Sequence, residues 1–296
     1  MNERPLRGIA LMTAATMCFS LSDAMTKMLV VRLPAIEVAW IRYVIFVLIV
    51  ATGMLARRDM MPTTRRPGIH VLRGLGIVGS SVFFVFGLSF LPLGQAAAIS
   101  FASPLFIAVL AAPFLGERVG AVGWSIVAAG FAGVLIVIRP GFGSFQPAAL
   151  LVLLSSLAWA FAMITTRRMV ATERPATILL WTSATGCAVL TLLVPFSFIP
   201  ITLGEFALTV LMSIAATAGQ MLAVLAYREA TASVLAPLSY CQLVWSTSLG
   251  CLLFASVPDL WTLVGAVLIV ASGLSTVQRE RLRMRRGRAL AAGDQA

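Results

Sequence analysis

The chain is built from apolar stretches of about 20 residues, separated by short segments rich in Pro, Gly and Arg. A helix needs about 20 apolar residues to cross the ~30 Å hydrocarbon core of a bilayer. Segments of about 10 residues with alternating polarity, which are typical of a membrane β-barrel, are missing from the sequence. We therefore predict an all-α membrane protein with ten transmembrane helices, at residues 8–31, 36–56, 71–91, 95–115, 120–138, 148–170, 177–197, 206–226, 231–256 and 260–277.

The composition agrees with this class. The chain is 60% hydrophobic and 11% charged, and its mean hydropathy of +0.98 is far above that of a soluble domain. The first apolar stretch follows Arg4 and Arg7, as the core of a signal peptide would. It is too long for one, however, and it contains Asp23 and Lys27, so we expect it to stay in the mature protein.

The net charge of +11 is concentrated on one predicted side of the membrane. With the N-terminus inside, 18 of the 22 Lys and Arg residues fall in cytoplasmic segments, including Arg73 and the six arginines of the tail. This bias predicts a multi-pass protein of the cytoplasmic (inner) membrane with both termini in the cytoplasm. The tail is expected to lie on anionic lipid. No aromatic residue is interleaved with its arginines, which argues against nucleic acid as a partner.

The four cysteines offer no metal chemistry. Cys18, Cys187, Cys241 and Cys251 all lie in apolar stretches, with no CxxC pair and no neighbouring histidine. Such cysteines are typical of small buried side chains. We expect neither a metal site nor a cofactor.

A shift of 140 residues superimposes the two halves of the chain. It places "MTKMLVV" (25–31) on "TTRRMVA" (165–171), Phe114 on Phe254 and Gly133 on Gly273 without a gap. Five helices in each half is an odd number, so the second half would cross the membrane in the opposite direction. We predict two inverted five-helix repeats, as in many secondary carriers, with the first repeat at 1–138, a linker at 139–147, the second repeat at 148–278 and a basic tail at 279–296.

Several motifs accompany these landmarks: "FSLSDAMTKML" (19–29), "PLGQAAAISFASPLF" (92–106), "LGER" (115–118), "IRPG" (138–141), "SYCQLVW" (239–245) and "VPDLWTLVGAVLIV" (257–270). With them, the chain resembles the drug/metabolite transporter superfamily, specifically its EamA-type carriers. It departs from their pattern at Phe19, where the family often has Trp, and at Val257, where it often has an acidic residue. The Asp-containing first helix is similar to the branch that includes S-adenosylmethionine and riboflavin permeases. The resemblance implies a cavity lined by helices 1, 3, 4, 6, 8 and 9.

Asp23 is the leading candidate for a functional residue. At 1.5 Å per residue it lies about 24 Å from Arg7 and about 13 Å from Arg32, inside the hydrocarbon. Intramembrane carboxylates commonly mark transport pathways, and the other carboxylates map to helix ends or loops. Two interpretations stay open: a structural ion pair with Lys27 or Arg42, or a contact with a cationic substrate group or a coupling proton. Lys27 itself is expected to anchor its helix at the interface.

The other candidate substrate-binding residues are polar or aromatic side chains within the predicted spans. Prolines within two of these spans free backbone carbonyls that can bind ligands or allow bending. Helix–helix hydrogen bonds explain each residue equally well when it is taken alone. The set is Ser20, Arg42, Gln95, Ser100, Trp159, Gln220, Tyr240, Gln242 and Trp245.

These features predict a secondary-active transporter that moves a small organic metabolite by alternating access. Export of an amino acid or related metabolite is the first choice from the resemblance, and uptake of a cofactor-like compound such as riboflavin or S-adenosylmethionine is the alternative. The substrate gradient or protons would drive it. An intramembrane enzyme is a distant alternative, because Asp23 lacks a second carboxylate and His70 lies at the end of its helix. A channel is another distant alternative. The oligomeric state is not predicted.

Overall fold

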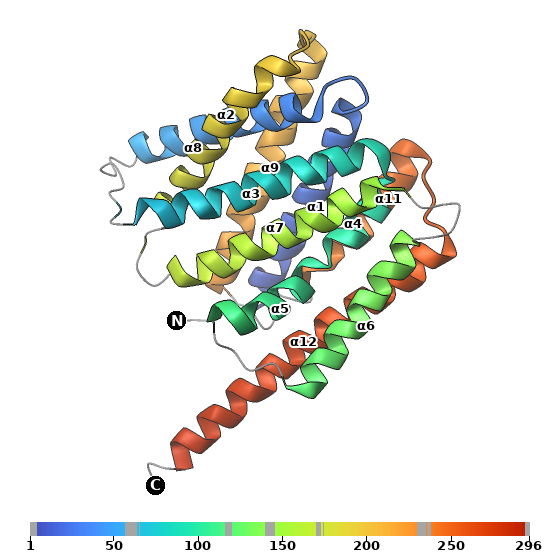
Figure 1. The fold of residues 1–296 in the computed structure, drawn as a ribbon. Helices are drawn as coiled ribbons and strands as arrows, with labels where there is room; N and C mark the ends of the chain where they lie inside the picture. Colours follow the sequence, from blue (N-terminus) through green and yellow to red (C-terminus); the bar gives the residue numbers. More distant parts are fainter. Residues whose placement is uncertain are drawn as a thin grey trace.

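The computed structural model describes residues 5–56, 64, 66–115, 120–139, 146–169, 173, 175–229, 235 and 238–293, and these residues form helices and connecting turns without a strand. The helices form one bundle (Figure 1). Their bounds are α1 Pro5–Leu29, α2 Ala35–Ala56, α3 Pro67–Phe90, α4 Leu93–Ser100, α5 Ser103–Leu115, α6 Ala121–Ile138, α7 Ala148–Met169, α8 Pro175–Leu193, the 3₁₀ turn η1 Val194–Phe196, α9 Leu203–Glu229, α11 Cys241–Phe254 and α12 Leu260–Gly293.

Eight helical segments of the described chain are long and apolar enough to cross a membrane, with α4 and α5 together forming one of them. Two shorter apolar helices, Cys241–Phe254 and Leu260–Thr276, lie where the last two spans are expected. The helical, membrane-spanning class of the protein is thus confirmed. The total of ten spans stays a prediction.

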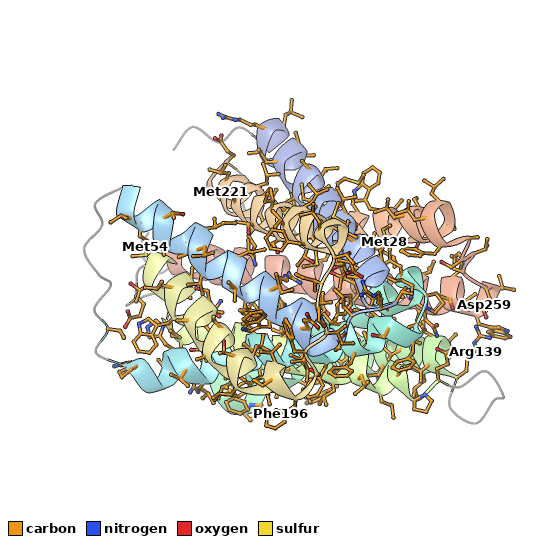
Figure 2. The ribbon with its side chains drawn as sticks, turned by 90° about the horizontal axis from the view of Figure 1, so that it is seen from above. Met28, Met54, Arg139, Phe196, Met221 and Asp259 are labelled. Carbon is orange, nitrogen blue, oxygen red and sulfur yellow. The ribbon has the colours of Figure 1, made fainter. Side chains whose placement is uncertain are left out.

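The bundle has two ends. Ion pairs and hydrogen bonds join the ends of α6 and α12 at Arg139 and Asp259, and those of α1 and α9 at Arg7 and Glu229. We call the first the distal end, where α1, α3, α6, α8 and α11 finish. The second is the termini end, because both chain termini lie on that side (Figure 1). Figure 2 looks along a perpendicular direction and shows Arg139 beside Asp259 at one edge of the bundle.

The predicted span at 95–115 is not one continuous helix. It divides at Phe101 and Ala102 into α4 and α5. Pro104 explains the break, because it lacks an N–H and its ring crowds the carbonyl of residue 100. The carbonyl of Ser100 accepts a hydrogen bond from Ser156 on α7 at 3.4 Å. In this structure the backbone carbonyl freed by the proline therefore serves helix packing, which is one of the alternatives that the sequence left open.

The predicted span at 231–256 is also interrupted. A turn at Tyr240 precedes α11, which begins at Cys241. Residues 231–234 and 236–237 lie outside the described residues. The 140-residue shift places position 101, the start of the first break, on position 241, next to this turn. The two breaks thus lie next to each other in the predicted repeat.

The helices pack in a definite set of pairs. The most extensive contacts are those of α1 with α9, of α3 with α7 and of α6 with α12, followed by α2 with α8. Glycine allows the closest approach: a Cβ at Gly133 on α6 would lie 2.8 Å from the carbonyl oxygen of Gly265 on α12. Small residues at such crossings are typical of membrane helices.

The largest core cluster lies toward the distal end. It joins residues of α1, α3, α4, α6, α7 and α12, among them Ala24, Leu88 and Ile269, and Phe254 of α11 packs against it. Large apolar side chains such as Phe196 and Met221, at 87% and 55% exposure, remain on the outside of the bundle. This pattern, apolar on both the inside and the outside, suits a lipid environment.

Arg73 corrects the predicted charge map. It was placed among the cytoplasmic segments, but it lies within the apolar helix α3 and is 8% exposed. Its guanidinium donates to the hydroxyls of Thr166 on α7, at 2.6 Å, and of Thr182 on α8. Arg73 therefore joins three helices inside the protein, where a charge needs such hydrogen bonds to be tolerated.

Candidate functional site

The centre of the candidate site is a polar contact between α1 and α11. Ser20 is fully buried and lies 3.0 Å from the hydroxyl of Ser246. Its Oγ also donates to the backbone carbonyl of Gln242 at 3.1 Å. One turn further along α1, Asp23 accepts a hydrogen bond from Nε2 of Gln242 at 3.2 Å. The structure thus brings together three of the predicted residues: Ser20, Asp23 and Gln242.

Lys27 does not pair with Asp23. Its Nζ donates to the carbonyl oxygens of Leu88, at 3.0 Å, and Leu91, at 2.6 Å, where α3 ends. The same Nζ stands 5.8 Å from the ring centroid of Phe254. The expectation that Lys27 acts as a simple interfacial anchor is therefore wrong, and the proposed Asp23–Lys27 ion pair is not formed.

Arg42 on α2 is not paired with Asp23. The ion pairs of the described residues include neither side chain. The described hydrogen bond from Gln242 thus leaves other lone pairs of the Asp23 carboxylate free. This arrangement can accept a cationic or hydrogen-bond-donating group.

Two aromatic rings meet where the broken helices approach each other. The rings of Tyr240 and Phe101 are 5.0 Å apart between centroids, with an angle of 36° between their planes. The hydroxyl of Tyr240 lies against Gly273 on α12, where a Cβ would collide with it. Sequence reasoning did not select Phe101. Its signal was the proline three residues later, which predicts a break but not the residue that borders it.

Trp245 on α11 carries an unused donor. Its Nε1 is buried and has no hydrogen-bond partner among the residues that the structure describes. A buried N–H without an acceptor costs about 1–3 kcal/mol. An acceptor on a bound substrate would remove this cost. Trp245 lies one turn beyond Gln242 on the same helix, which is consistent with a place in the same site.

Four predicted residues are not brought into this group. Ser100 donates to the carbonyl of Ala96 within its own helix. Trp159 on α7 is 37% exposed and Gln220 on α9 is also exposed, and no described hydrogen bond joins either one to Asp23. Gln95 donates to the carbonyl of Val137 at 3.3 Å, at the distal end.

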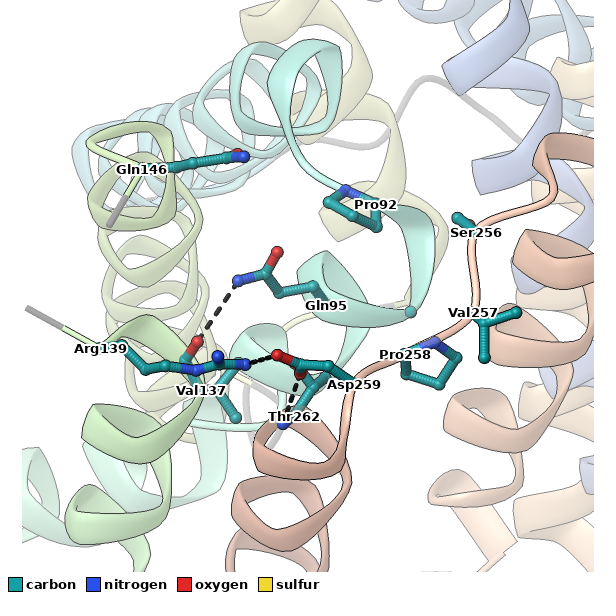
Figure 3. A pocket seen from close by; sticks show the side chains of 11 residues that line it. Pro92, Gln95, Val137, Arg139, Gln146, Ser256, Val257, Pro258, Asp259 and Thr262 are labelled. Carbon is teal, nitrogen blue, oxygen red and sulfur yellow. Dashed lines mark hydrogen bonds and ion pairs between the residues drawn. The ribbon is translucent and has the colours of Figure 1, made fainter. Parts of the chain in front are cut away.

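Gln95 belongs to a separate pocket of about 200 Å³ at the distal end (Figure 3). Arg139 and Asp259 face each other across it, and Asp259 also caps α12 by accepting from the backbone N–H of Thr262 at 2.9 Å. The resembled family often has an acidic residue at the position of Val257. In this chain Asp259 supplies one two residues later. Among the described residues, none of those that line this pocket belongs to α1. They are Pro92, Gly94, Gln95, Val137, Arg139, Gln146, Ser256, Val257, Pro258, Asp259 and Thr262.

The sequence did not predict that a second carboxylate, that of Glu37, is buried. Glu37 begins α2 and its side chain is fully buried, accepting from the backbone N–H of Ile199 at 3.1 Å. Its place in the first turn of a helix explains why it reads as a helix-end residue in the sequence. The described residues hold no cluster of three or more His, Cys, Asp or Glu side chains that could bind a metal ion.

Comparison with known proteins agrees with this architecture. The sequence model of the EamA-like transporter family matches residues 6–139 and again residues 146–277. The S-adenosylmethionine uptake transporter of Rickettsia bellii is 28% identical, over 94% of this chain and 95% of the relative. The riboflavin transporter of Rhizobium johnstonii is 32% identical, over 96% and 95%. The pseudopaline exporter of Pseudomonas aeruginosa is 28% identical, over 90% and 94%.

A solved crystal structure shares the fold with a TM-score of 0.65 and 21% identity, over 93% of this chain and 98% of the other. These relatives are named as transporters or exporters of small molecules. The family match extends over both halves of the chain. The chain therefore belongs to the EamA-like transporter family of the drug/metabolite transporter superfamily and is a multi-pass membrane protein.

Proposed function

We propose that this protein is a secondary-active carrier of ten transmembrane helices in two inverted repeats, which moves a small organic metabolite by alternating access. The packing pattern supports the repeats. A shift of 140 residues turns the pair α1 and α9 into the pair α7 and α3, and both pairs are extensive. The pairs of α2 with α8 and of α6 with α12 each map onto themselves, as a two-fold axis requires.

The positive-inside bias supports a place in the cytoplasmic membrane with the termini end in the cytoplasm. The driving force is then the gradient of the substrate or of protons. Coupling to protons needs an ionisable group within the membrane, such as a carboxylate. Asp23 is the carboxylate best placed for either role, because among the described residues its side chain accepts one hydrogen bond and forms no ion pair.

The single observation that carries the proposal is the carboxylate of Asp23, which among the described residues accepts one hydrogen bond, from Gln242, and forms no ion pair. Such a carboxylate suits a metabolite with a cationic group, and the aromatic residues Tyr240 and Trp245, which flank Gln242 in the sequence, favour one that also carries a ring. Amino acids, the first choice from the sequence, satisfy the cationic requirement. The names of two relatives favour the alternative, a larger cofactor-like compound such as S-adenosylmethionine or riboflavin. The pseudopaline exporter keeps outward movement open.

Replacement of Asp23 tests the proposal. Asp23→Asn removes the charge but retains an oxygen that can accept from Gln242, so the free energy of unfolding should change by less than about 1 kcal/mol. Transport should fall at least about tenfold, equivalent to about 1.4 kcal/mol of lost interaction. The assay is flux of radiolabelled S-adenosylmethionine, riboflavin and amino acids in proteoliposomes, with unfolding followed in parallel.

Glu229→Gln is the matched control, because Glu229 makes an ion pair with Arg7 at the termini end, away from the site. It should retain wild-type flux. Wild-type flux in Asp23→Asn would contradict the proposed role. A loss of stability as large as the loss of transport would instead identify Asp23 as a structural residue. A thermal-shift screen with the same compounds identifies the substrate, since a bound ligand raises the apparent stability.

A further inference from the structure

Lys27 joins three helices at the distal end. It extends from the end of α1 to two carbonyls at the end of α3 and stands over Phe254 at the end of α11. The last carbonyls of a helix lack intrahelical partners and carry partial negative charge. An ammonium with three donors is well suited to bind two of them together. Lys27 thus acts as a cationic link between helices, not as half of an ion pair.

A related contact lies at the opposite end of the bundle. Arg168, at the end of α7, donates to the carbonyl of Phe114 at the end of α5. Its guanidinium carbon also stands 6.0 Å from the ring centroid of Phe114. The described ion pairs do not include Arg168 either. Here too a cation binds a helix end and an aromatic ring together.

The predicted repeat relates the two contacts. The 140-residue shift places Phe114 on Phe254, and it places Lys27 on position 167, next to Arg168. Each contact also crosses between the two halves of the chain. Lys27 of the first half faces Phe254 of the second, and Arg168 of the second half faces Phe114 of the first. Halves that rock against each other must change such contacts.

The two contacts differ in strength. Lys27 is half-buried and binds two carbonyls beside the largest core cluster, which contains Leu88 and Leu91. Arg168 is exposed and binds one carbonyl. The distal end is therefore held more tightly in this structure. By the same shift, the equivalent of the α3 end is the end of α9.

We propose that Lys27 and Arg168 act as latches at opposite ends of the bundle, and that the carrier alternates by releasing one latch while it holds the other. This inference rests on the proposed alternating access. In the structure both contacts are formed, and Lys27 binds two carbonyls where Arg168 binds one. When the carrier opens at the distal end, Lys27 leaves the end of α3 while Arg168 stays bound at the termini end.

The rate of thiol labelling tests the latches without any substrate. Ala24 and Ile164 are equivalent by the 140-residue shift, and they are 0% and 1% exposed. Each is replaced singly, Ala24→Cys or Ile164→Cys, in a background without the four native cysteines. A small methanethiosulfonate reagent then reports the opening of the distal end or of the termini end.

Lys27→Met should raise the labelling rate of the Ala24→Cys protein roughly tenfold, since it removes two charge-assisted hydrogen bonds, and should lower the rate of the Ile164→Cys protein. Arg168→Met should have the opposite effects. Lys27→Arg is the matched control, because it keeps the donors and should stay near the wild-type rates. Gel filtration and thermal unfolding show that each variant is folded.

Unchanged rates in folded variants would overturn the latch proposal. Equal increases at both probes, which indicate general loosening, would overturn it as well. The outcome is separate from the proposed role of Asp23, because labelling needs no substrate. Asp23→Asn should stop transport and leave both labelling rates unchanged, so the failure of one proposal does not imply failure of the other.

Discussion

The crossing of α6 and α12 provides a quantitative test of the packing. Gly133 lies so close to α12 that a Cβ would be 2.8 Å from the carbonyl oxygen of Gly265 and 3.0 Å from Cγ1 of Ile269. Ordinary contacts between such atoms begin near ~3.4 Å, so Gly133→Ala must separate the helices by about 0.6 Å or distort them. The neighbour in this contact is backbone, which cannot rotate away.

The expected cost follows from two opposing effects. Overpacking in a close-packed interface costs about 1–3 kcal/mol, whereas Ala in place of Gly favours a helix by about 0.5–1 kcal/mol. We therefore expect Gly133→Ala to lower the free energy of unfolding by about 1–2 kcal/mol. Gly53→Ala on α2 is the control, because a Cβ there meets nothing within 4 Å. It should raise stability by up to about 1 kcal/mol.

The assay is unfolding of both variants by titration with sodium dodecyl sulfate in mixed micelles, followed by tryptophan fluorescence. The two alanine substitutions should change the midpoint in opposite directions. If Gly133→Ala were as stable as Gly53→Ala, the close approach of α6 and α12 would be wrong. The crossing of α6 and α12 would then no longer support the predicted two-fold axis.

Three further predictions concern the candidate site, the distal pocket and the orientation. Trp245→Phe removes the buried Nε1–H that lacks a partner among the described residues, so the free protein should be equally or more stable. A thermal-shift titration should show weaker substrate affinity, and unchanged affinity would remove Trp245 from the site. Arg139→Met breaks an ion pair whose side chains are 21% and 49% exposed, so the free energy of unfolding should fall by less than about 1 kcal/mol. Flux should stay within about twofold of wild type, because the distal pocket is separate from Asp23. Val31→Cys and Leu6→Cys place thiols at 83% and 82% exposed positions; an impermeant maleimide should label the first in intact cells and the second only after permeabilisation, and the reverse result would invert the topology.

The positions of the helices were largely predictable because the length and polarity of each stretch report directly on the bilayer. The spans at 36–56 and 120–138, for example, agree within a residue or two with α2 and α6. The breaks were less accessible. Pro104 in the sequence indicates that a carbonyl is freed, but whether a ligand or a neighbouring helix uses it depends on which helix lies alongside, and here Ser156 of α7 does.

The partners of the charged residues were not predictable from spacing. Lys27 follows Asp23 by one helical turn, an arrangement that favours an ion pair in an isolated helix. In the bundle the ends of α3 and α11 offer Lys27 a better environment, because unpaired carbonyls and an aromatic face compete with one carboxylate. Arg73 was misplaced for a similar reason, since the hydroxyls that bind it come from α7 and α8.

Small residues were partly informative. Gly133 and Gly265 meet at the α6–α12 crossing, as expected of a small-residue face. Gly273, the repeat equivalent of Gly133, faces Tyr240 instead. A glycine in a membrane helix therefore indicates a close approach, but the sequence does not say whether a helix or a bulky side chain fills the space.

The division between symmetric and asymmetric residues has a functional consequence. Each half of the chain has a cation at the end of its first helix, α1 or α7. Each half also has one helix break and a phenylalanine at the end of the helix that follows it, α5 or α11. A device that opens two ends in turn needs such equivalent parts. Asp23 has no equivalent, because the same shift places it on Met163. A substrate with one cationic group needs only one carboxylate, so changes at Asp23 should alter what is carried, whereas changes at the latches should alter which end is open.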